Sequence, residues 1–278
     1  MNRVVVLGFL SMLARCAAVL ALLAASAPAH ASETSDADQA LDAILRRLPR
    51  PEPYTLQSGL QVVIQPVPWQ SQVAVAVAYG VGARDDPSER RGLAHLVEHM
   101  TYRGSRHLPA YGAMPLVDGS GGQLFGGTHF DWTLYAELVP ALDLPRALWL
   151  ESERLAFTLE QFSEDSLYVE KRTVAQEMRL RDGVVTRFDM LVERALFGEQ
   201  SPYARQPDYS RFLQTFDLSD VRTFFRRNYR PDNGVLVVTG GVDSKVVREE
   251  VETYFGPVRN QARSSPVSPT GLRSWTMV

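Results

Sequence analysis

The sequence predicts an α+β fold, and three observations carry this prediction. Residues 60–67 and 72–79 are rich in Val, and their side chains follow the pattern of β-strands. Several later segments, of which residues 142–157 are the clearest, place Leu and Ala at helical spacing. A late run of Val and Leu at residues 234–240 has the continuous apolar character of a buried strand.

In chain order, the elements begin with a hairpin made of a short strand near Leu56, a turn at Ser58-Gly59 and the strand at residues 60–67. Further strands are expected at residues 72–79, 126–139 and 234–240, with His129 as a structural residue inside the second of these. The expected helices span residues 91–102, 142–157, 164–180, 185–197, 218–228 and 244–254.

Two further expectations concern segments between and within these elements. Residues 109–122 are rich in Gly and Pro and are expected to form a loop. Glu151 and Glu153 are expected on a solvated face of the helix at residues 142–157, paired with no histidine.

The helix at residues 91–102 carries the most informative pattern of the chain, His95-Leu96-Val97-Glu98-His99. At about 100° of turn per residue, its apolar side chains share one stripe, and the two histidines and the glutamate share the opposite face. Imidazoles at positions i and i+4 can bind one cation, and neutral imidazole suits zinc well. Glu98 reaches the same space, where it can take a proton from a water that the metal activates. The pattern predicts a zinc hydrolase; two solvated histidines beside a surface glutamate are the alternative interpretation.

A zinc site with two histidines needs a third protein ligand, usually a carboxylate, and leaves a position for water. The helix at residues 164–180, with Ser163 as its N-cap, carries Glu170 and Glu177. Because seven residues are nearly two helical turns, both carboxylates are expected on the same face. The spacing alone leaves both as candidates for the third ligand.

Residues 1–31 resemble a secretory signal peptide that is cut after Ala31. Arg3 provides an early positive charge, an apolar run follows at residues 16–27, and Ala29 and Ala31 are small residues at the cleavage positions. The mature protein is therefore expected to be secreted, to the periplasm, with no stable membrane span. Two alternatives are a lipoprotein signal that uses Cys16 and a retained membrane helix that includes residues 4–13.

Composition excludes several classes of protein. Cys16 is the only cysteine, so cleavage would leave no disulfide, thiolate ligand or thiol nucleophile. Loss of Arg3 and Arg15 would move the net charge from −3 to −5, which excludes nucleic acid as a partner. The hydrophobic fraction of 45% is that of an ordinary globular core.

Longer segments resemble the insulinase/pitrilysin metallopeptidases, a family that includes mitochondrial processing peptidase and bacterial processing-type zinc proteases. The matching segments lie within residues 54–257 and read GARDDPSERRGLAHLVEHMTYRGS, GGTHFDWTLYAELVP, EKRTVAQEM, and RRNYRPDNGVLVVTGGVD followed by YFGP. The resemblance implies a mixed, largely antiparallel sheet with helices packed mainly on one face, as in one processing-peptidase half-domain. It also implies that His95, His99 and Glu177 bind zinc. In the same family Glu98 corresponds to the general base, and Glu170 to a supporting acidic residue of the catalytic site.

The sequence departs from this family in two respects. Phe125-Gly126 stands where members usually have Asn-Ala, a pair on the edge strand that holds the substrate backbone. The family's working unit has two similar halves, whereas this chain matches the first half, and residues 270–275 resemble the opening strand of the second. The second half of the family supplies an Arg and a Tyr that help to polarise the substrate.

We therefore expect a signal peptide at residues 1–31, a linker with a short helix at 32–53, the N-terminal metallopeptidase domain at 54–258, and the start of a second half at 259–278. The expected function is that of a secreted zinc endopeptidase that hydrolyses peptides or unfolded polypeptides. A partner half-domain or subunit is expected to complete it. The alternative is a catalytically weak or inactive subunit or truncated product that keeps the fold. A different metal-dependent enzyme, such as a lyase or isomerase on a similar scaffold, is a third hypothesis.

Overall fold

The fold is taken from a computed structural model that describes residues 49–87, 90–181, 183–198, 200–204 and 210–260. The predicted signal peptide, the short helix expected before residue 49 and the strand expected at residues 270–275 lie outside the described residues. Within the described part, no helix is both long enough and apolar enough to cross a membrane.

A six-stranded sheet forms the base of the fold, with the strand order β1-β2-β6-β3-β5-β4. The strands are β1 (Glu52–Thr55), β2 (Gln61–Pro66), β3 (Gln72–Tyr79), β4 (Gln123–Thr128), β5 (Thr133–Pro140) and β6 (Gly234–Gly240). Only the β2–β6 pair is parallel, and the other four pairs are antiparallel. The predicted mixed, largely antiparallel sheet is therefore confirmed, and β1 and β4 form its edges.

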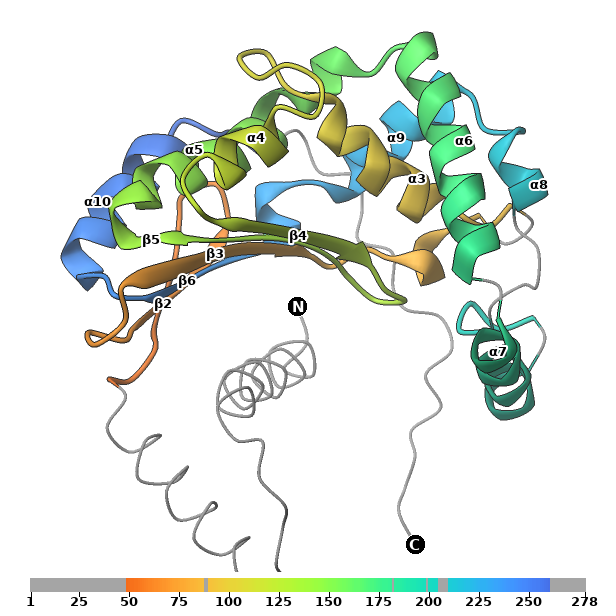
Figure 1. The fold of residues 1–278 in the computed structure, drawn as a ribbon, viewed down its shortest axis with the longest axis horizontal. Helices are drawn as coiled ribbons and strands as arrows, with labels where there is room; N and C mark the ends of the chain where they lie inside the picture. The colour runs from red at the N-terminus through yellow and green to blue at the C-terminus, as the bar shows by residue number, and fades with distance from the viewer. Residues whose placement is uncertain (1–48, 88–89, 182, 199, 205–209, 261–278) are drawn as a thin grey trace, which may run out of the picture. The chain divides into compact units, whose positions relative to one another are not determined.

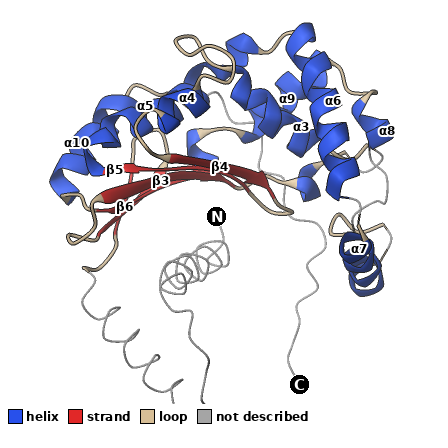
Figure 2. Cartoon of the chain, in the orientation of Figure 1, coloured by secondary structure: helices blue, strands red, loops and turns tan. Residues whose placement is uncertain are grey.

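The helices pack mainly on one face of this sheet, as predicted (Figures 1 and 2). They are α3 (Leu93–Met100), α4 (Ala113–Asp118), α5 (Leu144–Phe157), α6 (Glu164–Arg181), α7 (Val184–Phe197), α8 (Ser210–Leu213), α9 (Leu218–Asn228) and α10 (Ser244–Phe255). Helix α3 packs against the edge strand β4 and against α6 and α9. Helix α7 lies beyond the end of the sheet, below α6 in Figure 1.

The hydrophobic core fills the space between the sheet and this helix layer. Strand β3 directs Val73, Val75 and Val77 into it, and all three are fully buried. The apolar stripe of α3 joins the same core, as the sequence predicted, because Leu93, Leu96, Val97 and Met100 are buried. The opposite stripe of α3 is thereby turned toward the candidate site.

The single strand predicted at residues 126–139 is wrong, because this region is a hairpin. Strands β4 and β5 pair from Gln123↔Leu138 to Thr128↔Thr133, and the His129 N–H donates to the Trp132 carbonyl across the turn at 2.9 Å. His129 therefore lies in the turn, where its ring stacks on that of Trp132 with centroids 3.8 Å apart. The alternating side-chain pattern continues through the turn, which explains why the pattern suggested one strand.

The loop predicted at residues 109–122 is also partly wrong, because it contains helix α4. Pro115 stands inside this helix, near its first turn, where proline is tolerated because the first N–H groups have no helical acceptor. Helix α8, of four residues, was likewise not predicted. Both helices are short, so neither offers a long periodic pattern.

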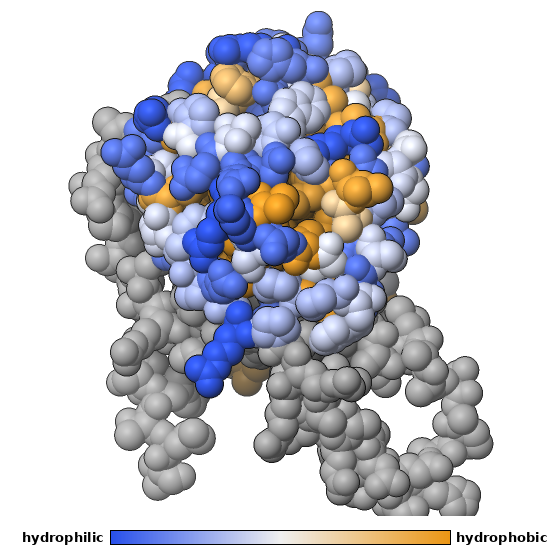
Figure 3. Space-filling model, turned by 90° about the vertical axis from the view of Figure 1, so that its left-hand side faces the viewer, coloured by the Kyte–Doolittle hydropathy of each residue, from blue (hydrophilic) through white to orange (hydrophobic). Residues whose placement is uncertain are grey.

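The surface of the described residues is mainly hydrophilic on the face drawn in Figure 3, with hydrophobic residues gathered near its middle. Single exposed apolar residues are common on protein surfaces, whereas a continuous apolar stripe often marks an interaction site. Such a stripe occurs on α7, where Val184, Phe188 and Leu191 are 86%, 64% and 63% exposed. Their spacing of four and three residues places them on one side of the helix.

Candidate metal centre

Helix α3 is only eight residues long, and Asp86 fixes its N-terminus. Gly92 precedes the helix with φ +100°, a conformation that glycine adopts without strain. The two carboxyl oxygens of Asp86 accept the N–H groups of Gly92, at 2.7 Å, and Ala94, at 2.8 Å. Burial raises the pKa of Asp86 to about 7, against the lowering effect of these two N–H donors.

Buried polar groups also hold the C-terminal end of α3. The Thr101 hydroxyl donates to the Glu98 carbonyl at 2.7 Å. The Arg154 guanidinium donates to the Thr101 hydroxyl at 3.2 Å, and the Thr158 hydroxyl donates to the Gly104 carbonyl at 2.7 Å. Because Arg154 carries its positive charge at a helix C-terminus, it also complements the helix dipole.

The carboxylates expected on a solvated face of α5 are buried, so that prediction is wrong. Glu151 is fully buried and accepts from Arg154 Nε at 2.9 Å. Glu153 is 4% exposed and accepts from the Ser105 hydroxyl at 2.5 Å. Its other oxygen lies 2.8 Å from His107 Nδ1, which contradicts the expectation that no histidine pairs with it. Ser105 and His107 come from a distant part of the chain, and Arg154 lies three residues from Glu151 on the same helix, a pair that the pattern of apolar residues does not reveal.

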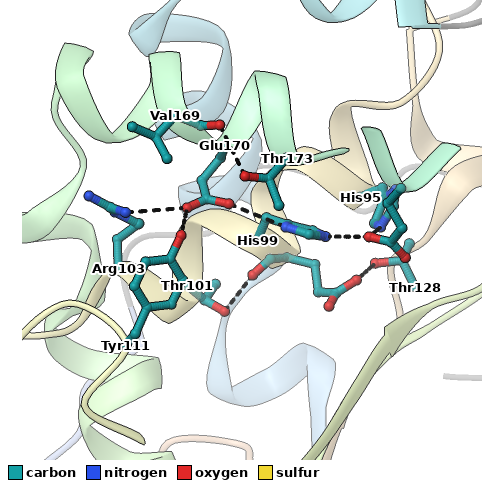
Figure 4. Close-up of polar contacts among 11 residues, drawn as sticks. His95, His99, Thr101, Arg103, Tyr111, Thr128, Val169, Glu170 and Thr173 are labelled. Atoms are coloured by element: carbon teal, nitrogen blue, oxygen red, sulfur yellow. Dashed lines mark hydrogen bonds and ion pairs between the residues drawn. The ribbon is translucent and has the colours of Figure 1, made fainter. Parts of the chain in front are cut away.

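The structure brings His95, His99 and Glu177 close together, and Figure 4 shows how the two histidines lie. Glu177 Oε2 lies 3.6 Å from His95 Nε2 and 3.1 Å from His99 Nε2. Tetrahedral zinc with ligand bonds of about 2.1 Å separates its ligand atoms by about 3.4 Å. The two distances from Glu177 bracket this value, and all three ligand atoms lie within 4.8 Å of one another, so the three side chains could hold one metal ion.

The electrostatics of the three groups favour a charged carboxylate. His95, followed by Arg181 and His99, lowers the pKa of Glu177 to about 2, although partial burial opposes this. Burial lowers the pKa of His99, but the hydrogen bond with Glu170 and the nearby carboxylates outweigh it, so the net shift is upward. The other oxygen of Glu177 pairs with the guanidinium of Arg181.

Glu170 lies behind His99 rather than beside Glu177. It is 1% exposed, and its Oε2 lies 3.3 Å from His99 Nδ1. A proton on Nδ1 would be donated to Glu170, which leaves His99 Nε2 free to face Glu177. The two carboxylates therefore share one face of α6, as predicted, but contact different nitrogens of the same imidazole.

Glu98 lies on the same side of α3 as the histidines, and Thr128 holds its carboxylate. The Thr128 hydroxyl, on the edge strand β4, donates to Glu98 Oε2 at 2.9 Å. Glu98 is 6% exposed, yet it lines a cavity of about 670 Å³ together with His95, His99 and Glu177. The carboxylates of Glu98 and Glu177 and the imidazoles of the two histidines therefore line one cavity that is large enough for part of a peptide.

Gly126 lies on the wall of this cavity, and its lack of a side chain has a steric reason. A Cβ at this position would lie 1.9 Å from the hydroxyl oxygen of Tyr102 and 3.6 Å from Glu98 Oε1. The Tyr102 hydroxyl thus takes the space that an alanine methyl would need. The neighbouring Phe125 is half exposed on the same edge strand.

Several residues around the centre were not found from the sequence. Thr128, Tyr111 and Arg103 contact the predicted residues Glu98 and Glu170 through hydrogen bonds or ion pairs. The two residues of each contact lie 30 or more positions apart in the sequence, so only packing brings them together. His129 lines the cavity but is not part of the His95, His99 and Glu177 cluster.

Together, the fold and site define an α+β protein with a cluster of two histidines and one glutamate suited to a metal. Residues 61–200 match the family described as insulinase, peptidase family M16, and residues 215–274 match its domain described as inactive. Since the first match covers half of the chain, this protein belongs to the M16 family, as the resemblance indicated. Relatives of this chain are named zinc proteases, which implies zinc as the metal.

The zinc protease PqqE of Helicobacter pylori is 30% identical over 217 residues, which are 77% of this chain and 48% of that protein. The crystal structure of a protease from Helicobacter pylori superposes with a TM-score of 0.74 at 28% identity, covering 80% of this chain and 54% of that one. The periplasmic protease PqqL of Escherichia coli has a TM-score of 0.71 at 22% identity, covering 80% and 25%, and shows the shared fold. The chain spans about half the length of the curated relatives that it matches.

Proposed function

We propose that this chain is the metal-binding half of a secreted zinc endopeptidase that hydrolyses peptides or unfolded polypeptides. The observation that carries the proposal is the convergence of His95 Nε2 and His99 Nε2 on one oxygen of Glu177, beside Glu98 and inside a large cavity. In this proposal His95, His99 and Glu177 are the metal ligands. A bound zinc ion would polarise a peptide carbonyl and lower the pKa of a water.

The residues around the metal would have separate roles in proton transfer, orientation of a ligand and binding of the peptide. Thr128 holds Glu98 Oε2, so that the other oxygen of Glu98 is left to take a proton as the general base. Glu170 would fix the orientation of His99 through Nδ1. Strand β4 is an edge of the sheet beside Glu98, and an extended peptide can add to such an edge through backbone hydrogen bonds.

A second half or partner subunit is part of the proposed working unit. The matched part of this chain spans about half the length of its relatives, and the apolar stripe of α7 is exposed in the described structure. A second wall would exclude water from the cavity and hold the peptide on both sides. The signal-like residues 1–31 and the periplasmic relative PqqL support secretion to the periplasm.

The test combines metal content with hydrolysis of an unfolded peptide. The chain is expected to bind about one zinc ion, and substitution of His95 or His99 by Ala is expected to remove it. Glu98→Gln should retain zinc while the rate of hydrolysis falls by about 10²–10⁴-fold, because the base is lost but the shape is kept. Zinc retained by both histidine variants, or equal activity of Glu98→Gln and the parent, would refute the proposal.

The half-length coverage favours a second candidate, a catalytically weak or inactive subunit that keeps the fold and the metal ligands. This candidate predicts zinc binding with no hydrolysis at any protein concentration. Recovery of hydrolysis after a second half is added would identify the chain as the metal-binding half of a divided enzyme.

A further inference from the structure

Tyr111 has an unusual backbone conformation for a bulky residue. Among the described residues it is the only non-glycine residue with a positive φ, at +58°. A side chain with a Cβ is strained in this left-handed region, so such a residue persists only where its surroundings hold it. Tyr111 lies in the segment that connects the end of α3 to α4, close in sequence to both.

The contacts of Tyr111 connect this segment to the candidate metal centre (Figure 4). Its hydroxyl donates to Glu170 Oε1, and its N–H donates to the Tyr102 carbonyl at 2.8 Å. The guanidinium carbon of Arg103 lies 4.9 Å from the centre of the Tyr111 ring, while Arg103 Nη1 lies 3.5 Å from the same Glu170 oxygen. The strained backbone therefore places a hydroxyl donor on a buried carboxylate.

The Glu170 carboxylate also contacts His99, a predicted metal ligand. Glu170 Oε2 lies 3.3 Å from His99 Nδ1, and His99 Nε2 lies 3.1 Å from Glu177. With Tyr111 and Arg103 on one oxygen and His99 on the other, the Glu170 carboxylate cannot rotate without loss of a hydrogen bond. Residues that hydrogen-bond to a metal-ligating histidine fix its tautomer and its ring orientation.

We infer that Tyr111 is a positioning residue of the metal centre, which acts on His99 through Glu170. This inference rests on the proposed function, since it assumes that His99 Nε2 binds zinc. Tyr111 is 45% exposed, so its ring is not part of the hydrophobic core. The strained backbone is then maintained for the geometry of the site rather than for burial.

The first test measures zinc affinity by competition with a chromogenic chelator at one fixed pH. Tyr111→Phe removes only the hydroxyl and keeps the ring beneath Arg103. Its zinc affinity is expected to fall by about tenfold, at the low end of the range for outer residues of metal sites. Tyr168→Phe is the matched control, because this tyrosine lies on α6 near Glu170, is 62% exposed and contacts only Arg172 through its hydroxyl oxygen in the described structure.

A double substitution separates positioning from a general structural effect. If Tyr111 acts through Glu170, Tyr111→Phe should cause no further loss of zinc affinity in the Glu170→Gln background. The metal-free thermal midpoints of Tyr111→Phe and Tyr168→Phe should match the parent. An equal loss in both backgrounds, or parental affinity of Tyr111→Phe, would overturn the inference.

A second readout does not require zinc. In the metal-free chain at pH 9, the ¹⁵N shifts of His99 should indicate a proton on Nδ1, and Tyr111→Phe should increase the population protonated on Nε2. An identical tautomer population in the parent and Tyr111→Phe would refute the positioning role. If Tyr111→Phe changes the tautomer population as expected but the parent binds no zinc, the proposed function fails while the connection from Tyr111 through Glu170 to His99 remains supported.

Discussion

Gly126 and Tyr102 form a steric pair beside Glu98, and their substitution tests the site geometry directly. A methyl at residue 126 would lie 1.9 Å from the Tyr102 hydroxyl oxygen, whereas an ordinary contact needs about 3.4 Å. The Tyr102 ring has little room to move away, because the Arg154 guanidinium lies 4.9 Å from its centre and the Tyr135 ring lies 5.9 Å from it. Gly126→Ala should therefore overpack the wall of the cavity.

The loss of stability expected for Gly126→Ala follows from this clash. Overpacking by one methyl typically costs about 1–3 kcal/mol, and a domain of this size loses about 2–4 °C of thermal midpoint per kcal/mol. We expect Gly126→Ala to lower the free energy of unfolding by about 2 kcal/mol and the midpoint by about 4–8 °C. Tyr102→Phe removes the clashing oxygen and leaves the ring carbon Cζ at 3.1 Å from the added methyl, which small shifts can accommodate.

The assay is thermal and denaturant unfolding of the two single variants and the double variant. Tyr102→Phe should restore most of the stability lost by Gly126→Ala, which gives a favourable coupling of about 1–2 kcal/mol. Gly127→Ala is the matched control, since a Cβ at the adjacent residue meets no atom within 4 Å. Parental stability of Gly126→Ala, or strictly additive effects in the double variant, would refute the steric explanation.

Four other predictions concern the metal, two buried carboxylates and the exposed stripe. Zinc at 100 times its dissociation constant should stabilise the chain by about 2.7 kcal/mol and raise the midpoint by about 5–10 °C, and calorimetry of the His99→Ala variant should show no such rise. Burial, and then the charge of Glu151, raise the pKa of Glu137 well above its usual range. Above pH 4.5 the folded chain should therefore hold a proton that the unfolded chain has lost, so the free energy of unfolding should fall as pH rises toward that raised pKa; Glu137→Gln should remove this slope. Glu151→Gln should instead cost about 3–5 kcal/mol, because it keeps an acceptor for Arg154 Nε but removes the negative charge that is paired with buried Arg154. Phe188→Glu, on the α7 stripe, should reduce association measured by light scattering, whereas Leu142→Glu, on another exposed apolar residue, should leave the mass unchanged.

The sequence predicted the elements with long or regular patterns, and the structure shows why. Strand β3 and helix α9 have the predicted bounds, because their side chains repeat with the period of one element between clear end signals. The β4–β5 hairpin was predicted as one strand, since its side chains keep the same alternation through the turn. The turn depends on tertiary pairing that a local pattern does not encode.

The candidate site likewise contains residues that the sequence pattern could predict and residues that it could not. His95, Glu98 and His99 are neighbours on one helix, so their spacing reveals a shared face. Spacing left Glu170 and Glu177 equivalent, and only the resemblance to the family separated their roles. Glu151 and Glu153 were predicted on a solvated face because helical periodicity does not identify the Arg154, Ser105 and His107 partners that allow burial.

The shortness of α3 connects the stability of the fold to the geometry of the site. An isolated helix of eight residues is not stable in water, so α3 depends on tertiary contacts for its conformation. Asp86 satisfies two N–H groups at one end, and Arg154 with Thr158 contacts the backbone and side chains at the other. These contacts therefore fix the positions from which His95 and His99 approach Glu177, at 3.6 Å and 3.1 Å. The buried polar residues at both ends are therefore part of the metal centre in a physical sense, although none of them is placed among its ligands.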